Sequence, residues 1–172
     1  MILLGLLGCP KPPEAPPPAL EATPREAPAP VVPTGKLEGR TWVDARGFTL
    51  EAPDGWTVQA GNEPGALRVA LVDPETHVRV EVWAFTEGPL RPRPREGCAW
   101  TFEDRARYRA VKVTGDVLAA TCTPDVPGGP RVLGYYVARE GVAWHLEAVV
   151  PAGELHDGKQ AADGVFGTFR LR

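Results

Sequence analysis

The chain has 172 residues, and its 19 Lys and Arg residues against 22 Asp and Glu residues give a formal net charge of −3. This near balance excludes the strongly basic surface that is typical of nucleic-acid-binding proteins. Serine is absent from the sequence, which excludes mechanisms that depend on a serine nucleophile, including the Ser-His-Asp triad.

The N-terminus carries a short apolar run, residues 2–8, that ends at Cys9. A helix that spans a membrane needs about 20 apolar residues, so this run is too short to cross a bilayer. The segment Leu6-Leu7-Gly8-Cys9 resembles the lipobox of bacterial lipoproteins. The resemblance implies cleavage before Cys9 and a lipid on its sulfur, so we expect residues 1–8 to be a signal peptide. The alternative is a chance cysteine after an apolar N-terminus.

A proline-rich stretch follows the cysteine. Ten of the chain's 20 prolines lie between Pro10 and Pro33, and large apolar residues are nearly absent there. Such a stretch buries too little to offset the entropy cost of ordering it, and its prolines favour an extended polyproline II conformation. We expect residues 9–35 to form the lipidated cysteine and a semi-rigid linker, and residues 36–172 to fold as one domain.

Alternation of apolar and polar residues predicts that most of the domain consists of β-strands. Single strands are expected at residues 41–45, 48–51, 56–59, 67–71 and 77–85. Two hairpins are expected after them, one joining residues 108–114 to 117–123 and the other joining residues 131–139 to 142–150.

Two segments are predicted to be helical. Residues 97–107 place Ala99, Phe102 and Ala106 three and four positions apart, and residues 155–166 precede a closing strand or last turn at 168–171. The order of strands, helix, strands and helix indicates an α+β fold with an antiparallel sheet.

Two motifs of the domain resemble a known family. Residues 47–56, GFTLEAPDGW, look like the opening of PsbP-like domains, in which a strand F-x-L-x-x-P-x-G-W precedes a turn. Residues 165–171 are similar to the end of that family's terminal helix. The resemblance covers residues 40–172 and implies an antiparallel β-sheet flanked by helices, in an α/β/α sandwich.

The PsbP-like family includes extrinsic photosystem subunits, a nucleotide-release factor for a small GTPase, and many bacterial envelope lipoproteins. The lipobox groups this chain with the lipoproteins. No metal ligand or GTPase-binding residue of the other members aligns with this sequence, so the resemblance implies neither a metal nor a cofactor.

Three cysteines are present, and two of them remain if Cys9 is lipidated. In an oxidising compartment an even pair favours a disulfide, which here would join Cys98 at the start of the first predicted helix to Cys122 at the end of a strand. The alternative is a reactive thiol, but the sequence has no C-x-x-C motif and no histidine close to either cysteine.

The segment Arg91-Pro92-Arg93-Pro94-Arg95 is the most unusual local feature of the domain. Its prolines hold an extended loop, and guanidinium groups keep their charge at any physiological pH. Loops often carry charge without a function, so the interpretation that we favour is a stiff, solvated loop. The alternative is that Arg91, Arg93 and Arg95 bind an envelope protein or an anionic cell-wall group.

Catalytic motifs are scarce. His145 and Glu147 share one face of a predicted strand and, together with His77, have the side chains of an acid–base or metal site. Such residues more often form the solvated face of a half-buried sheet, and this is the interpretation that we favour. The sequence contains no phosphate-binding glycine loop and no H-E-x-x-H motif.

The sequence therefore predicts a non-enzymatic, lipid-anchored protein of the cell envelope, facing the periplasm or the cell surface. Its domain would bind or support a partner, with no metal, no cofactor and no nucleic acid. The alternative function is an envelope hydrolase that uses a carboxylate or His145. A third is a domain that only braces a larger assembly.

Overall fold

The computed structural model of the chain describes residues 32–86, 90–103, 111–114 and 116–172. The chain divides into two compact units, Met1–Pro30 and Val31–Arg172, and every described residue belongs to the second unit. The expected signal peptide, Cys9 and most of the expected linker lie outside the described residues. The second unit is the domain described below.

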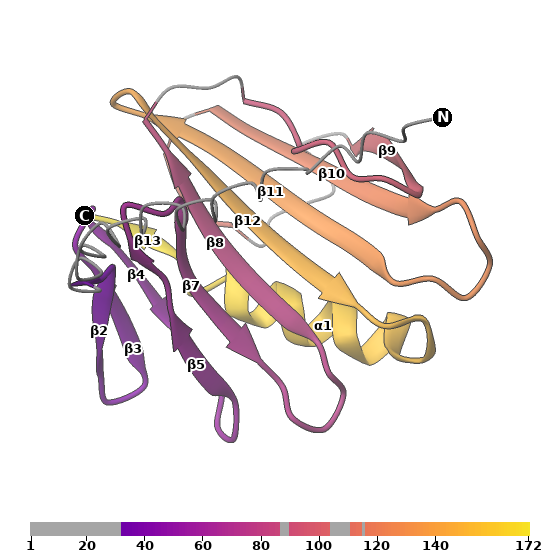
Figure 1. Cartoon of the computed structure of the whole chain (residues 1–172), viewed down its shortest axis with the longest axis horizontal. Helices are drawn as coiled ribbons and strands as arrows, with labels where there is room; N and C mark the ends of the chain where they lie inside the picture. The colour runs from indigo at the N-terminus through magenta and orange to yellow at the C-terminus, as the bar shows by residue number, and fades with distance from the viewer. Residues whose placement is uncertain (1–31, 87–89, 104–110, 115) are drawn as a thin grey trace, which may run out of the picture. The chain divides into compact units, whose positions relative to one another are not determined.

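A seven-stranded antiparallel sheet forms the larger layer of the domain, with strand order β5-β7-β8-β12-β11-β10-β9 (Figure 1). Its strands are β5 (Thr57–Ala60), β7 (Leu67–Val72), β8 (Arg79–Phe85), β9 (Cys98–Glu103), β10 (Asp116–Pro124), β11 (Arg131–Arg139) and β12 (Val142–Val150). Because β12 pairs with both β8 and β11, it lies in the interior of the sheet, where both of its faces are available for packing.

A smaller sheet and one helix form a second layer. The smaller sheet has the order β13-β4-β3-β2 and consists of β2 (Gly35–Glu38), β3 (Thr41–Asp44), β4 (Phe48–Glu51) and β13 (Arg170–Leu171). Helix α1 (Leu155–Phe166) follows the 3₁₀ turn η2 (Ala152–Glu154). A two-stranded ladder joins β1 (Val32–Pro33) to β6 (Asn62–Glu63).

The hydrophobic core lies between these two layers. Alternate residues of β8 and β12 point toward α1 and are buried, among them Val80, Val82, Ala84, Trp144, Leu146 and Ala148. They meet Ala162, Val165 and Phe166 of the helix. The Phe48 ring of the smaller sheet packs edge-on against Trp144, with ring centroids 5.2 Å apart. One face of β12 therefore belongs to the core.

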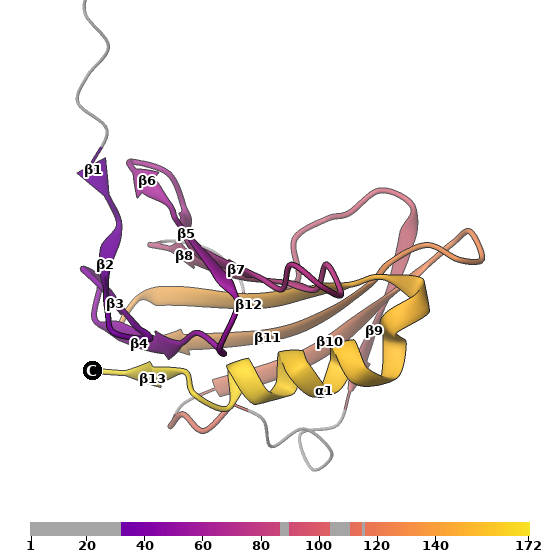
Figure 2. The same cartoon turned by 90° about the horizontal axis from the view of Figure 1, so that it is seen from below.

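The expected α/β/α sandwich is wrong. Within the described residues the domain is mostly β-structure with one α-helix, and Figure 2 shows that helix on one face of the larger sheet. The opposite face carries a loop that leads into β9 (Figure 2). The second layer is thus a helix joined by a small sheet, and no α-helix is found on the opposite face among the residues that can be placed.

The error arose at the first predicted helix. The described part of that segment begins with β9, which pairs with β10. The spacing of Ala99 and Phe102 fits a helix, but the alternation of Cys98, Trp100 and Phe102 fits a strand equally well, and cross-strand pairing decides between them. Residues 104–107 lie outside the described residues.

Some of the other predicted elements are confirmed and others are wrong. Strands β11 and β12 and helix α1 have the predicted bounds. The predicted hairpin onto residues 117–123 is wrong in its described part, because residues 111–114 form no strand and β10 pairs with β9 and β11. Strands β1 and β2 begin at Val32 and Gly35, inside the stretch that we assigned to the linker.

The predicted disulfide between Cys98 and Cys122 is confirmed, with Cα atoms 5.6 Å apart. It joins β9 to β10, so it ties an edge strand to its neighbour rather than a helix to the sheet. Among the placed residues, no helix combines the length and the apolar character needed to cross a membrane.

Candidate functional site on the polar face of the sheet

The face of the larger sheet that points away from α1 is rich in polar and aromatic side chains. Strand β8 contributes Glu81 and Trp83, which lie beside Glu147 and His145 of β12 in the strand register. The prediction that His145 and Glu147 share a face is therefore confirmed. The expectation that this face is solvated is wrong, because the exposed fraction is 5% for His145 and 0% for Glu147.

Residues 90–97, which we call the arginine strap, pass over this face (Figure 2). The Arg93 Nη2 atom lies 2.6 Å from Glu147 Oε2, and the Arg95 Nη2 atom lies 3.3 Å from the same oxygen. The Arg93 guanidinium carbon also stacks 3.9 Å above the centroid of the Trp83 ring, within the range of a cation–π contact. Two of the three predicted partner-binding arginines thus point into the molecule, whereas Arg91 is exposed.

These contacts explain how a carboxylate can be completely buried at Glu147. Burying an unpaired carboxylate costs several kcal/mol, so its charge needs paired donors close by. Arg93 and Arg95 supply charge-assisted hydrogen bonds, which are stronger than neutral ones. The prolines of the strap help, because a restricted backbone loses less entropy when the strap is held against the sheet.

A second carboxylate extends the network toward the edge of the sheet. Glu81 accepts hydrogen bonds from Arg79 Nε at 2.6 Å and from Trp83 Nε1 at 3.1 Å. Its other contact is with Arg93, at 4.0 Å. Positive and negative side chains therefore alternate across β8, the strap and β12, so each carboxylate faces at least one guanidinium.

Tyr136 of β11 also contacts the Glu147 carboxylate. Its hydroxyl lies 3.4 Å from Glu147 Oε1, to which it donates a hydrogen bond. Burial and the neighbouring Glu147 charge raise the pKa of Tyr136 well above its usual value. The hydroxyl therefore stays protonated and remains a donor.

His145 is enclosed by aromatic rings. Its imidazole centroid lies 4.7 Å from that of Phe85 and 4.9 Å from that of Tyr136, and its Nδ1 atom has no hydrogen-bond partner among the described residues. Burial lowers the pKa of His145, and the nearby Arg93 charge lowers it further, although Glu147 acts in the opposite direction. The geometry therefore favours a neutral imidazole packed as an aromatic ring.

This arrangement offers little for acid–base chemistry. A general base has to reach its substrate, whereas Glu147 is buried and held by two arginines. His77 lies in the turn before β8, and His145 pairs with Trp83 near the far end of that strand. At about 3.3 Å per residue, this places the two histidines roughly 20 Å apart. Nowhere in the described ranges do three or more metal-ligating side chains gather in a way that could hold an ion.

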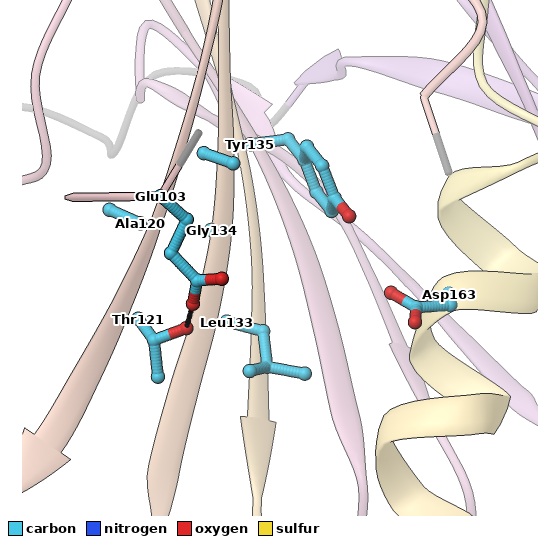
Figure 3. Close-up of a pocket in the computed structure, with 8 residues that line it drawn as sticks. Glu103, Ala120, Thr121, Leu133, Gly134, Tyr135 and Asp163 are labelled. Carbon is cyan, nitrogen blue, oxygen red and sulfur yellow. Dashed lines mark hydrogen bonds between the residues drawn. The ribbon is translucent and has the colours of Figure 1, made fainter. Parts of the chain in front are cut away.

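A separate hollow between α1 and strands β9–β11 also contains carboxylates. Figure 3 shows Glu103 on the strand side, where it accepts a hydrogen bond from the Thr121 hydroxyl, and Asp163 on the helix side. Asp163 is paired with Lys159 one turn earlier in the helix. The volume of the hollow is about 10 Å³, which is room for about one water molecule. As bounded by the described residues, the hollow has no room for a ligand much larger than water.

A buried ionic cluster that was not predicted from the sequence centres on Arg68, which is 0% exposed. Its guanidinium binds Asp44 through Nε and Nη2, at 3.1 to 3.2 Å, and also binds Glu63. Nη2 also donates to the Thr34 carbonyl at 3.1 Å. Burial works against the charge, but the carboxylates outweigh it and raise the pKa of Arg68. The signal available in the sequence was one charged residue inside the otherwise apolar segment 67–72. In the structure, Arg68 lies at an irregularity of the strand register between Leu67 and Val69.

Comparison with known proteins adds evidence on the fold. No family model matches the chain, and no curated protein matches it either. Among solved structures, the chain is similar to the solution structure of cyanobacterial PsbP (CyanoP) from Synechocystis sp. PCC 6803. That match has a TM-score of 0.52 and 10% sequence identity, and it covers 80% of this chain and 98% of the other.

A second similar structure is a protein from Bacteroides thetaiotaomicron VPI-5482, with a TM-score of 0.47 and 13% identity. This match covers 79% of our chain and 49% of the other. At such identities a match is evidence of fold alone, and the match to cyanobacterial PsbP supports the resemblance seen in the sequence motifs. The domain has a PsbP-like fold.

Proposed function

We propose that the chain is a lipid-anchored protein of the cell envelope whose PsbP-like domain binds or supports a partner without catalysing a reaction. Cys9 would carry the lipid, and the proline-rich stretch would hold the domain away from the membrane. The domain would face the periplasm or the cell surface.

The burial and pairing of Glu147 are the observation that supports a domain without catalytic activity. This carboxylate is 0% exposed, and its oxygens are occupied by Arg93, Arg95 and Tyr136. A hydrolase built on His145 or a neighbouring carboxylate would need these groups open to substrate. Their enclosure supports a structural role for this face and leaves the exposed surface of the domain for a partner.

The anchored part of the proposal rests on the sequence. The apolar run ends in the lipobox-like segment Leu6-Leu7-Gly8-Cys9, and nine prolines follow before the domain begins at Val31. In a polyproline II conformation, at about 3.1 Å per residue, residues 10–31 would span up to roughly 70 Å. A tether of that length would let the domain meet a partner well outside the membrane surface.

The mass of the full-length protein recovered from membranes tests the anchor. We expect the wild type to lack residues 1–8, to carry acyl chains on Cys9 and to sediment with membranes. Cys9→Ala should keep its N-terminus and leave the membrane fraction. Lys11→Ala, two residues further on, is the matched control and should behave as the wild type. Unprocessed wild-type protein without acyl chains would refute the anchor.

Crosslinking in intact cells tests the partner role. A photo-reactive residue at position 91, on the outer side of the strap, should give a discrete crosslinked product that Cys9→Ala reduces. The same residue at Gln160, exposed on α1, is the control for random collisions. Equal products from both positions would show that the strap does not mark a partner surface.

A further inference from the structure

Three arginines from separate elements line a hollow at one end of the domain. Arg46 lies in the turn between β3 and β4, Arg139 ends β11, and Arg172 follows β13. Trp144 and Val142 supply the apolar part of the lining, and Glu140 is its carboxylate. We call this feature, with a volume of about 110 Å³, the basic hollow.

Backbone contacts hold the rim of the basic hollow in place. The Arg172 amide donates to the Gly47 carbonyl at 2.8 Å, which brings the end of β13 against the turn that carries Arg46. Arg139 stands at the start of a tight hairpin in which Glu140 and Gly141 adopt positive φ values of 52° and 78°. The three guanidinium groups are thus carried by a short turn, a hairpin and a paired strand end.

The charges of the basic hollow are not balanced by its own lining. Among the side chains of the lining, three arginines against one glutamate leave an excess of two positive charges. Glu140 pairs with Arg139 at 3.1 Å, but 79% of its side chain is exposed, so water screens this pair strongly. Arg46 donates to a neutral acceptor, the Ala84 carbonyl, over a long distance of 3.4 Å.

Carboxylates near the basic hollow are already paired elsewhere. Glu63, which is close enough for Arg46 to lower its pKa, takes its main hydrogen bond from Arg68. Glu38, whose pKa is lowered in part by Arg172, pairs mainly with Lys36. The positive charge of the hollow is therefore available to an external anion.

We propose that the basic hollow binds a phosphate group. Arginines from three elements line the hollow. A tetrahedral phosphate presents oxygens toward three sides, whereas a planar carboxylate presents only two oxygens. Arginine also forms bidentate, charge-assisted hydrogen bonds with phosphate. The volume suits one phosphate group with a small attached fragment. The site does not depend on the anchor at Cys9 or on the strap.

Titration of the isotope-labelled full chain with inorganic phosphate tests the proposal by NMR, with ionic strength held constant by chloride. We expect saturable shifts of the amide of Gly47, which directly follows Arg46, and of the amide of Gly141, which lies two positions after Arg139. Arg46→Gln and Arg139→Gln should each weaken the affinity about tenfold, because each removes a hydrogen bond between charged groups. Arg131→Gln changes the exposed arginine at the other end of β11 and should leave the affinity unchanged.

Two further binding experiments identify the source of the phosphate. Flotation with phosphatidic acid vesicles, but not with phosphatidylcholine vesicles, would support binding to a lipid phosphate. Binding of inorganic phosphate and glycerol phosphate alone would support a soluble source. Shifts that do not saturate, an equal affinity for acetate, or equal losses in Arg131→Gln and Arg139→Gln would overturn the proposal. Unchanged thermal unfolding of each variant verifies that it folds.

Discussion

The described part of the domain has two buried clusters of ion pairs, and they differ in the elements that carry the paired charges. Arg68 and Asp44 are both buried on strands, β7 of the larger sheet and β3 of the smaller one. Glu147 is equally buried, but its partners Arg93 and Arg95 come from the strap and keep 28% and 32% of their side chains exposed. The first cluster joins two sheets, whereas the second fastens a loop to a sheet that is otherwise complete.

This difference predicts how much stability the domain loses when an arginine of each cluster is replaced. Losing Arg68 leaves the Asp44 carboxylate, whose side chain is 0% exposed, without its ionic partner on two packed strands. Losing a strap arginine lets the loop move away, so that water can solvate Glu147. The same kind of ion pair therefore should contribute more to stability at Arg68 than in the strap.

The largest effect is expected for Arg68→Leu. It leaves the buried charge of Asp44 unpaired, so we expect unfolding in urea to show a loss of about 3 to 5 kcal/mol. Adding Asp44→Leu should recover part of that loss, because the unpaired charge is then gone. Arg131→Leu, on an exposed position of β11, is the control. A loss no larger than in this control would remove the distinction between the clusters.

Removing the disulfide tests how far the strap depends on its covalent end at Cys98. The bridge joins residues that are 24 positions apart, and the chain-entropy relation for a loop of this size gives about 3.5 kcal/mol. We expect the double variant Cys98→Ala with Cys122→Ala to lower the free energy of unfolding by about this amount. Hydrogen exchange of the β9 amides should rise more than that of β7, which lies near the other edge of the sheet. Equal rises in both strands would contradict a local role.

The strap itself is tested by the double variant Arg93→Gln and Arg95→Gln. We expect a loss of about 2 kcal/mol, smaller than at Arg68 because water can reach the opened site. Adding Glu147→Gln should recover part of it, since the buried charge is then removed. Arg91→Gln, the exposed arginine of the same loop, should have little effect. No recovery in the triple variant would show that the strap contributes packing rather than charge pairing.

The smallest effect is a pH dependence from His145. An unfolded histidine titrates near pH 6.5, whereas burial lowers the pKa of His145 in the folded state. Below pH 6.5 the unfolded chain therefore binds a proton that the folded chain does not, and stability falls as the pH falls through that window. His145→Gln should reduce this slope in denaturant titrations, and His156→Gln, at an exposed helix position, should not. An unchanged slope in His145→Gln would contradict the burial.

Much of the fold could be predicted from local patterns. Strands β11 and β12 and helix α1 have long, regular spacing of buried residues, so their bounds could be read directly. Segment Cys98–Glu103 was ambiguous because its apolar residues fit both periods, and pairing with β10 resolved it. Long-range pairing of this kind leaves little trace in the local sequence.

The candidate site was predicted less well, for a related reason. The Arg-Pro alternation indicated a charged, extended loop, but no local signal shows that Arg93 binds Glu147, which lies 54 positions later. Glu147 itself was assigned to a solvated face because charged residues are seldom buried without partners. Arg68 escaped attention because its partners come from β3 and β6, which only the folded chain brings to it.

The most direct test of the account is whether the face that carries His145 is closed. Modification of the native protein with diethylpyrocarbonate, read by peptide mass spectrometry, compares His145 with the exposed His156 in one sample. We predict that His156 reacts while His145 is protected, and that the double strap variant makes His145 reactive. Equal modification of both histidines in the wild type would contradict a closed face and reopen the question of catalysis there.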